Sequence, residues 1–169
     1  MSFLNRILKT FLGDKAQKDV SIIQPLVLEI NQIQKEFENI SNDELRSKTS
    51  SLKRKIKDGR SQIDKEIHDI EIDIETTKSY ETKEQLYLKI DSLEEKAYED
   101  IQNILNIILP EAFAIIKETA RRFKLNSSLE VSAKNFDLIL SSKHDYVELK
   151  DDKAIWKNHW DAAGKPITW

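Results

Sequence analysis

Few residues in this sequence have the types and spacings that catalysis or metal binding requires. The three histidines, His68, His144 and His159, form no H-E-x-x-H motif and no pair at helical ligand spacing. The Gly-Lys pair at 164–165 is followed by proline rather than the serine or threonine of a phosphate-binding loop, and no G-x-S-x-G motif occurs. The carboxylates recur at regular, solvated spacings, so none is singled out for acid–base work. We therefore expect no catalytic residue, metal site or cofactor site within this chain.

The composition favours long helices and excludes several classes of protein. The 169 residues include only 3 Gly and 3 Pro, and no Cys, which excludes disulfides and thiolate metal sites. Since 30 acidic residues nearly balance 27 basic ones, at a net charge of −3, the chain lacks the basic excess of a nucleic-acid-binding protein. No stretch approaches the ~20 apolar residues of a membrane span.

The residues with the clearest binding chemistry lie at the N-terminus. Apolar side chains recur there on one helical face, and Gly13 follows as an expected C-cap. Residues 1–18 contain four basic residues and one Asp, which gives a local charge of +3. Such a helix binds an anionic membrane surface or a groove on a partner, or else packs on its own domain. The expected membrane- and partner-binding residues are Phe3, Leu4, Arg6, Ile7, Leu8, Lys9, Phe11, Leu12 and Lys15.

Two long apolar seams predict a helical hairpin in the middle of the chain. A second helix is expected from about residue 22, with Pro25 in its first turn, and the S-x-x-E capping box Ser41–Glu44 begins a third. The first seam comprises Leu45, Leu52, Ile56, Ile63, Ile67, Ile70 and Ile74. The second seam comprises Leu86, Ile90, Leu93, Ala97, Ile101, Ile104 and Ile108. Both have the narrow spacing of coiled coils.

The connection between the two seams leaves two arrangements open. Residues 76–80 are poor helix formers but include no Gly or Pro, so an antiparallel hairpin is favoured over a continuous rod without excluding it. A second capping box is expected at Thr82–Gln85, and Gly59 is a point where the first arm could break. A turn near Lys78 would place the basic residues of 53–60 opposite the acidic residues of 94–100.

The last third of the chain changes character and predicts a small β element. Pro110 stands at an expected first helical position, so a compact helix is expected over 110–124. A strand at Leu129–Ala133, a short helix near Phe136 and a β-hairpin about Asp151-Asp152 should follow. Trp156 and Trp169 are expected to pack near His159. The predicted fold is mainly α with a small β element (α+β), in four parts: 1–40, 41–109, 110–124 and 125–169.

Three segments of the chain resemble the start of the SecA family of preprotein-translocase ATPases. They are the opening helix, the segment Ile40–Thr49 with its I-S-N-D-E-L sequence, and the segment Leu109–Phe123 with its L-P-E-A-F-A sequence. The hairpin and the β-rich stretch resemble insertions in longer, Bacteroidetes-type members, as do N-H-W at 158–160 and I-T-W at 167–169.

This resemblance implies an N-terminal fragment of a motor that uses ATP and Mg²⁺ to push secretory preproteins through the SecYEG channel. Because the family's nucleotide site is expected after Trp169, no catalytic or cofactor-binding residue is carried over. The implied partners are SecYEG and anionic phospholipids, through residues 1–18, and secretory preproteins; a homodimer stays open. The implied location is the cytoplasm, peripherally on the inner face of the membrane. The alternative is a free-standing coiled-coil adaptor with a membrane-binding N-terminal helix.

Overall fold

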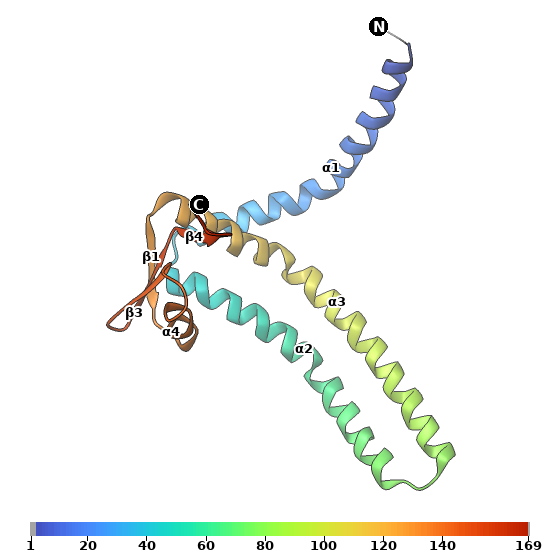
Figure 1. Ribbon diagram of the computed structural model, residues 1–169. Coiled ribbons are helices and arrows are strands. Elements are labelled where there is room, and N and C mark those ends of the chain that lie inside the picture. Colours follow the sequence, from blue (N-terminus) through green and yellow to red (C-terminus); the bar gives the residue numbers. More distant parts are fainter. Residues whose placement is uncertain (1–2, 169) are drawn as a thin grey trace.

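A computed structural model describes the backbone of residues 3–168 and the side chains from residue 17 onward. Three long helices and a small β region make up this part of the chain (Figure 1). The helices are α1 (Phe3–Phe37), α2 (Asn42–Thr76), α3 (Tyr80–Leu125) and the short α4 (Asn135–Ser141), and the strands are β1 (Ser128–Ser132), β2 (Val147–Lys150), β3 (Lys153–Lys157), β4 (His159–Ala162) and β5 (Lys165–Thr168). The expected fold, mainly α with a small β element, is confirmed.

The first helix is longer than its sequence predicts. Instead of ending at Gly13 and restarting near residue 22, α1 continues from Phe3 to Phe37 and curves along its length (Figure 1). The residues after Gly13 are helix formers, and one glycine costs a helix only about 1 kcal/mol. Pro25 lies in the helix interior, where tertiary packing of Ile30 and Ile33 on the core holds the following turns. The expected break at Gly13 is therefore wrong.

The two seams form the antiparallel hairpin that was favoured from the sequence. The capping box that begins α2 is present as predicted, because the Ser41 hydroxyl accepts a hydrogen bond from the Glu44 amide and the Glu44 carboxylate accepts one from the Ser41 amide. At the tip, α3 begins at Tyr80 with Ser79 as its N-cap, and the Thr82 amide donates to the Ser79 hydroxyl. The expected N-cap at Thr82 is wrong by one turn, because the helix already begins at Tyr80 and the Ser79 hydroxyl is the capping acceptor.

The hairpin core lies between the two seams. Its buried residues are Leu45, Leu52, Ile63, Ile67, Ile70 and Ile74 on α2, and Ala97 and Ile108 on α3. Gly59 does not break α2, and a side chain there would overlap Ile104, so the glycine lets the two helices approach closely. The expected charge match is present at Arg60 and Glu94, 2.9 Å apart, whereas Lys55 pairs with Glu111 nearer the base, at 3.2 Å.

The third helix does not stop before Pro110. It runs from Tyr80 to Leu125 with Pro110 buried in its interior, so the separate helix expected from residue 110 is the last third of α3. The proline removes one hydrogen bond to the carbonyl of Asn106, and Asn106 is exposed, so water can serve that carbonyl instead. Packing of Ile108, Ala114 and Ile115 in the core with Phe37 and Leu45 keeps the helix continuous.

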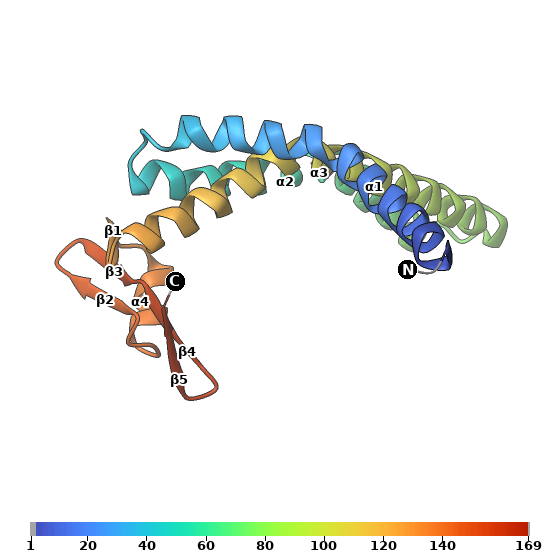
Figure 2. The same cartoon turned by 90° about the horizontal axis from the view of Figure 1, so that it is seen from above.

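The β region folds against the base of the hairpin, away from its tip (Figure 2). Strand β3 is central in a sheet of order β1-β3-β2 and is antiparallel to both neighbours. The turn between β2 and β3 uses Asp151 at φ 53°, and the turn between β4 and β5 uses Ala163 at φ 53° and Gly164 at φ 76°. The strand, short helix and hairpin expected between residues 129 and 158 are confirmed.

Candidate functional site

The predicted membrane- and partner-binding residues have helical backbone within α1. Their side chains, from Phe3 to Lys15, lie outside the described residues, so their role stays a prediction. In the first turns of α1 whose side chains are described, several apolar side chains are exposed. They are Val20, Ile22, Ile23, Val27 and Leu28, between 39% and 68% exposed. These exposed side chains precede the turns of α1 that enter the core, from Ile30 to Phe37.

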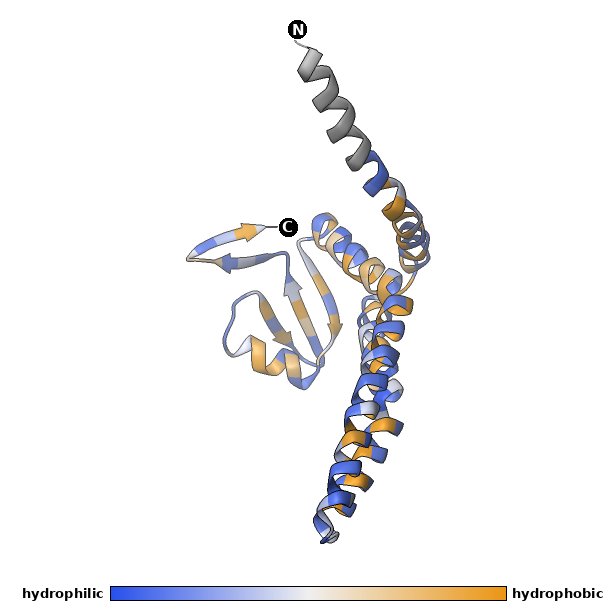
Figure 3. Ribbon diagram, turned by 90° about the vertical axis from the view of Figure 1, so that its right-hand side faces the viewer, coloured by the Kyte–Doolittle hydropathy of each residue, from blue (hydrophilic) through white to orange (hydrophobic). Residues whose placement is uncertain are grey.

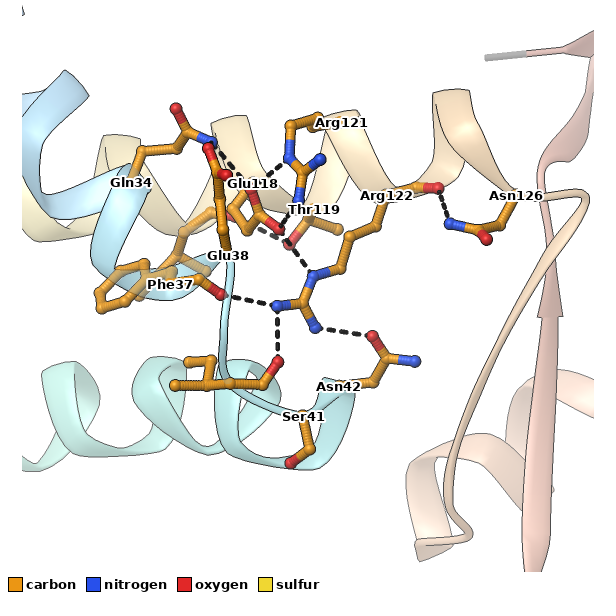
Figure 4. A network of polar contacts seen from close by, with 12 residues as sticks. Gln34, Phe37, Glu38, Ser41, Asn42, Glu118, Thr119, Arg121, Arg122 and Asn126 are labelled. Carbon is orange, nitrogen blue, oxygen red and sulfur yellow. Dashed lines mark hydrogen bonds and ion pairs between the residues drawn. The ribbon is translucent and has the colours of Figure 1, made fainter.

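A buried polar network joins α1, α2 and α3 at the base of the hairpin (Figure 4). Glu118 on α3 is fully buried. Its carboxylate accepts hydrogen bonds from Arg121 at 2.8 and 2.9 Å, from Arg122 at 2.8 Å and from Gln34 of α1 at 2.9 Å. Charged hydrogen bonds of this kind compensate the loss of hydration of a buried carboxylate. Glu118 therefore anchors the end of α1 to α3.

Arg122 extends this network to the connection between α1 and α2. Its guanidinium donates to the carbonyl oxygens of Phe37 and Ile40 at 2.7 and 2.8 Å, and to the side-chain oxygen of Asn42 at 2.7 Å. The Phe37 carbonyl belongs to the last turn of α1, which has no helical partner for its final carbonyls. One arginine thus donates hydrogen bonds to acceptors in the last turn of α1, in the connecting turn and in the first residue of α2 (Figure 4).

The ionisation of Glu118 follows from these contacts. Burial acts to raise its pKa, and the hydrogen bonds from Arg121, Arg122 and Gln34 outweigh burial and lower the pKa to about 2. The carboxylate is therefore charged at every physiological pH. A permanently charged and fully paired carboxylate stabilises the packing of the helices, and it is a poor general acid or base.

A second buried carboxylate, Asp137, attaches the β region to the hairpin. Arg46 of α2 binds it through two hydrogen bonds of 2.8 Å. The amide of Lys134 and the indole of Trp156 donate to the same carboxylate, at 2.8 and 3.1 Å. Burial acts to raise the pKa of Asp137, and the pairing with Arg46 and these hydrogen bonds lower it overall. Asp137 therefore joins α2, α4 and β3.

The first turn of α2 also covers the outer edge of β1. The Asp43 carboxylate accepts from the Ser132 amide at 2.9 Å, and the Asn42 amide group donates to the Glu130 carbonyl at 3.0 Å. The hydrogen bond from the Ser132 amide lowers the pKa of Asp43. Covering an edge strand with side chains blocks unwanted strand pairing. Beside this contact lies a cavity of about 240 Å³, and its lining includes the apolar side chains of Leu45, Phe123 and Trp156.

Several aromatic side chains of the β region lie close together around Trp156. Trp156 stacks on Phe136, with ring centroids 6.3 Å apart, and lies 6.4 Å from Tyr146. Trp169 lies outside the described residues, so the packing expected near His159 stays a prediction. His144 stacks on Tyr146 at 4.8 Å, and His68 is exposed beside Glu71. Among the residues that the structure describes, no three acidic, His or Cys side chains are grouped to hold a metal ion.

Sequence reasoning missed the two buried carboxylates. Glu118, Arg121 and Arg122 have the i, i+3 and i+4 spacing that brings side chains together on one helix face, so this signal was available. Asp137 had no such signal, because its partner Arg46 is 91 residues away. Within residues 3–168, no helix is long and apolar enough to cross a bilayer.

The fold and its buried networks define a helical scaffold that presents an amphipathic N-terminal helix and a projecting hairpin. The chain belongs to the SecA DEAD-like domain family, whose model matches residues 8–137. It is 49% identical over 169 residues to the protein translocase subunit SecA of Christiangramia forsetii, and 47% identical over 169 residues to that of Flavobacterium psychrophilum. The match to the Phocaeicola vulgatus subunit is 42% over 166 residues. These alignments cover 98–100% of the chain and 15% of each relative. No solved structure matches the chain.

Proposed function

We propose that this chain is the N-terminal part of a SecA-type motor that pushes secretory preproteins through the SecYEG channel. The observation that carries the proposal is 49% identity over the entire chain to a protein translocase subunit SecA. The chain spans about 15% of the length of such relatives, so ATP hydrolysis, with ATP and Mg²⁺, is assigned to the rest of the motor. Residues 1–169 contribute attachment and rigidity rather than chemistry.

The contacts at the base of the hairpin support a scaffold role. Glu118 and Arg122 lock the end of α1 against α2 and α3, while Asp137 fixes the β region to α2. Among the described side chains, those of α1 that pack on the core lie between Ile30 and Phe37, and a helix held there can present its N-terminal residues to a surface outside the domain. We assign residues 1–18 to binding anionic lipid and the channel, on the inner face of the cytoplasmic membrane, because they combine a +3 charge with an apolar face.

Binding of the chain to SecYEG proteoliposomes tests the docking part of the proposal. The chain should co-sediment more strongly with anionic vesicles that contain SecYEG than with protein-free vesicles of the same lipid. A variant that lacks residues 1–13 should lose most of this binding, whereas Asp69→Asn, an exposed substitution on α2, should retain it. Equal binding of all three proteins to both vesicle types would contradict the docking role.

The reading frame beyond residue 169 separates this function from a free-standing adaptor. The proposal expects a G-x-x-x-x-G-K-[ST] phosphate-binding loop within a few dozen codons, because a motor requires one. A stop codon directly after Trp169 would instead favour the adaptor.

A further inference from the structure

The half of the hairpin nearest its tip extends away from the rest of the described fold. Figure 1 shows the ends of α2 and α3 about the tip projecting away from both α1 and the β region. Figure 3 shows hydrophilic and apolar residues alternating along both arms down to the tip. The seams bury one side of each helix, so the two flanks of this half of the hairpin are open to a binding partner.

One flank of α3 alternates tyrosines with carboxylates. Tyr80, Tyr87 and Tyr98 are 86%, 55% and 66% exposed. Glu84 and Asp91 lie among them at intervals of three, four and seven residues, which share one side of an α-helix. Both carboxylates are exposed, and neither has an ion-pair partner in the described part of the chain. We refer to these five residues as the tyrosine–carboxylate face.

The second helix adds further carboxylates on the same side. The ion pair between Arg60 and Glu94, at 2.9 Å, shows which side of α2 adjoins the face, because Glu94 lies one turn from two of its members. Glu71 and Glu75 follow Arg60 by eleven and fifteen residues, which returns them to its side of α2. Both are exposed; Glu71 lies 3.7 Å from His68. The tyrosine–carboxylate face therefore has a second acidic edge.

Most of the basic side chains in this half of the hairpin lie on the opposite side. Lys89 and Lys96 follow the first tyrosine by nine and sixteen residues, which places them about 160–180° around α3. Lys65 is five residues after Arg60, about 140° around α2. Arg60 itself is held between two carboxylates, and Lys83 is half-buried at the edge of the face. The side that presents the tyrosines is thus negatively charged.

The chemistry and length of this face match a cationic helix. A tyrosine ring attracts an arginine or lysine cation to its π face, and it buries apolar area while its hydroxyl stays in contact with water. Carboxylates one turn away can pair with the same cations, and complementary charge sets the orientation of a partner. Tyr80 and Tyr98 are eighteen residues apart, so the face is about 27 Å long.

We propose that the tyrosine–carboxylate face binds a basic amphipathic helix of another protein, in which arginines or lysines recur every three or four residues. The bound helix lies along α3, with its cations between the tyrosine rings and with Glu71 and Glu75 of α2 along its second edge. The negative charge of the face repels anionic lipid and nucleic acid, so neither of these is the occupant.

Isothermal titration of the 169-residue chain with two synthetic peptides tests this proposal. The probe is a helical peptide of about 27 Å, with arginine at every third or fourth position and leucine beside each arginine. The control has the same composition with all its arginines at the N-terminal end. The probe should bind 1:1 and more weakly as salt rises, and the control should bind about tenfold more weakly than the probe. Equal or tighter binding of the control would overturn the proposal.

Substitution of the tyrosines tests their part in the contact. Tyr87→Ala/Tyr98→Ala should weaken binding of the probe about tenfold, because buried aromatic side chains are the usual energetic centres of an interface. Ile107→Asp, on the opposite side of α3 and 75% exposed, should leave binding unchanged or strengthen it. Circular dichroism should show that each variant retains its helical content. Unchanged binding by the folded tyrosine variant would overturn the proposal.

A matched pair of charge variants separates this face from general attraction to an acidic chain. Glu84→Gln/Asp91→Asn removes two carboxylates from the face, whereas Asp69→Asn/Asp73→Asn removes two from the opposite side of α2, nine and thirteen residues after Arg60. Only the first variant should lose most of its affinity for the probe. Equal losses would show that net charge alone attracts the peptide, and the proposal would be wrong. A chain that lacks residues 1–13 should bind the probe unchanged, so the outcome is independent of docking through those residues.

Discussion

At the scale of single residues, Glu118 and Arg122 determine how the long helices meet. Their side chains contact α1, the α1–α2 connection, α2 and each other. Removing one partner of a buried pair leaves the other charged group unsatisfied, which costs several kcal/mol. The base of the hairpin should therefore be more sensitive to polar substitutions than its exposed arms.

Glu118→Gln should destabilise the chain in a pH-dependent manner. The pKa of Glu118 is lowered from its ordinary 4.5 to about 2, so its charged form stabilises the fold. A shift of that size corresponds to about 3 kcal/mol, fully present above about pH 5 and lost as the pH falls toward 2. Urea unfolding of both proteins should show a difference in the free energy of unfolding that shrinks between pH 5 and pH 2.

The exposed Glu95→Gln serves as the control for that experiment. It should stay within about 0.5 kcal/mol of the wild-type chain at each pH. If Glu118→Gln matched this control at pH 7, the network would contribute nothing to stability.

At the scale of elements, the sequence predicted those features that depend on residues close together in the chain. The Ser41–Glu44 capping box, the two seams and the β2–β3 turn at Asp151-Asp152 depend on neighbours in sequence, and each is present. The continuity of α1 and α3 depends instead on packing. Pro25 and Pro110 weaken one turn each, and contacts of Ile30 and Ile108 with distant core residues offset that loss.

The candidate site likewise combines features visible in one segment with contacts between distant residues. The leader residues were named because amphipathic spacing and charge are visible in a single segment, and their role stays a prediction. The Arg46–Asp137 and Gln34–Glu118 contacts join residues that are 91 and 84 positions apart, and single-sequence patterns contain no information on such pairs. The tip of the hairpin was uncertain for another reason, because residues 76–80 contain neither Gly nor Pro to mark the turn.

Ile67→Asp should unfold the distal half of the hairpin. Ile67 is 8% exposed in a cluster with Ile63 and Ala97, so a carboxylate there would lose its hydration without a partner, at a cost of several kcal/mol. Asp69→Asn, two residues away on an exposed face, should change the thermal midpoint by no more than about 2 °C. Thermal unfolding followed by circular dichroism measures both, and equal midpoints would contradict the arrangement of the seams.

At the scale of the whole molecule, the chain should neither bind nor hydrolyse ATP. It contains no phosphate-binding loop, and the described residues include no cluster of carboxylate, His or Cys side chains able to hold a metal ion. Isothermal titration with Mg²⁺ and ATP should give no saturable heat. A specific site with micromolar affinity would show that nucleotide chemistry begins within residues 1–169.

The leader should bind anionic vesicles weakly and in a salt-dependent manner. Each basic residue near an anionic surface contributes about 1 kcal/mol, so a local charge of +3 supplies about 3 kcal/mol, to which the apolar face adds a hydrophobic share. Co-sedimentation should fall as salt rises from 0.05 M to about 0.5 M, because screening removes the electrostatic share.

Two single substitutions separate the contributions to that binding. Ile7→Asp should weaken binding at every salt concentration, whereas Lys9→Glu should weaken it mainly at low salt. Binding that neither substitution changes would show that this face packs within its own domain.

The most direct test of the central claim is a segment exchange with a known translocase. Residues 1–169 would replace the aligned segment of the Christiangramia forsetii SecA subunit, to which the chain is 49% identical. Transport of a secretory preprotein into SecYEG proteoliposomes would then be measured with ATP present and absent. We predict that the chimera transports the preprotein only with ATP, and that the same chimera carrying Glu118→Gln is less active. A soluble, folded chimera that hydrolyses ATP but transports no preprotein would contradict the assignment of this chain to a SecA-type motor.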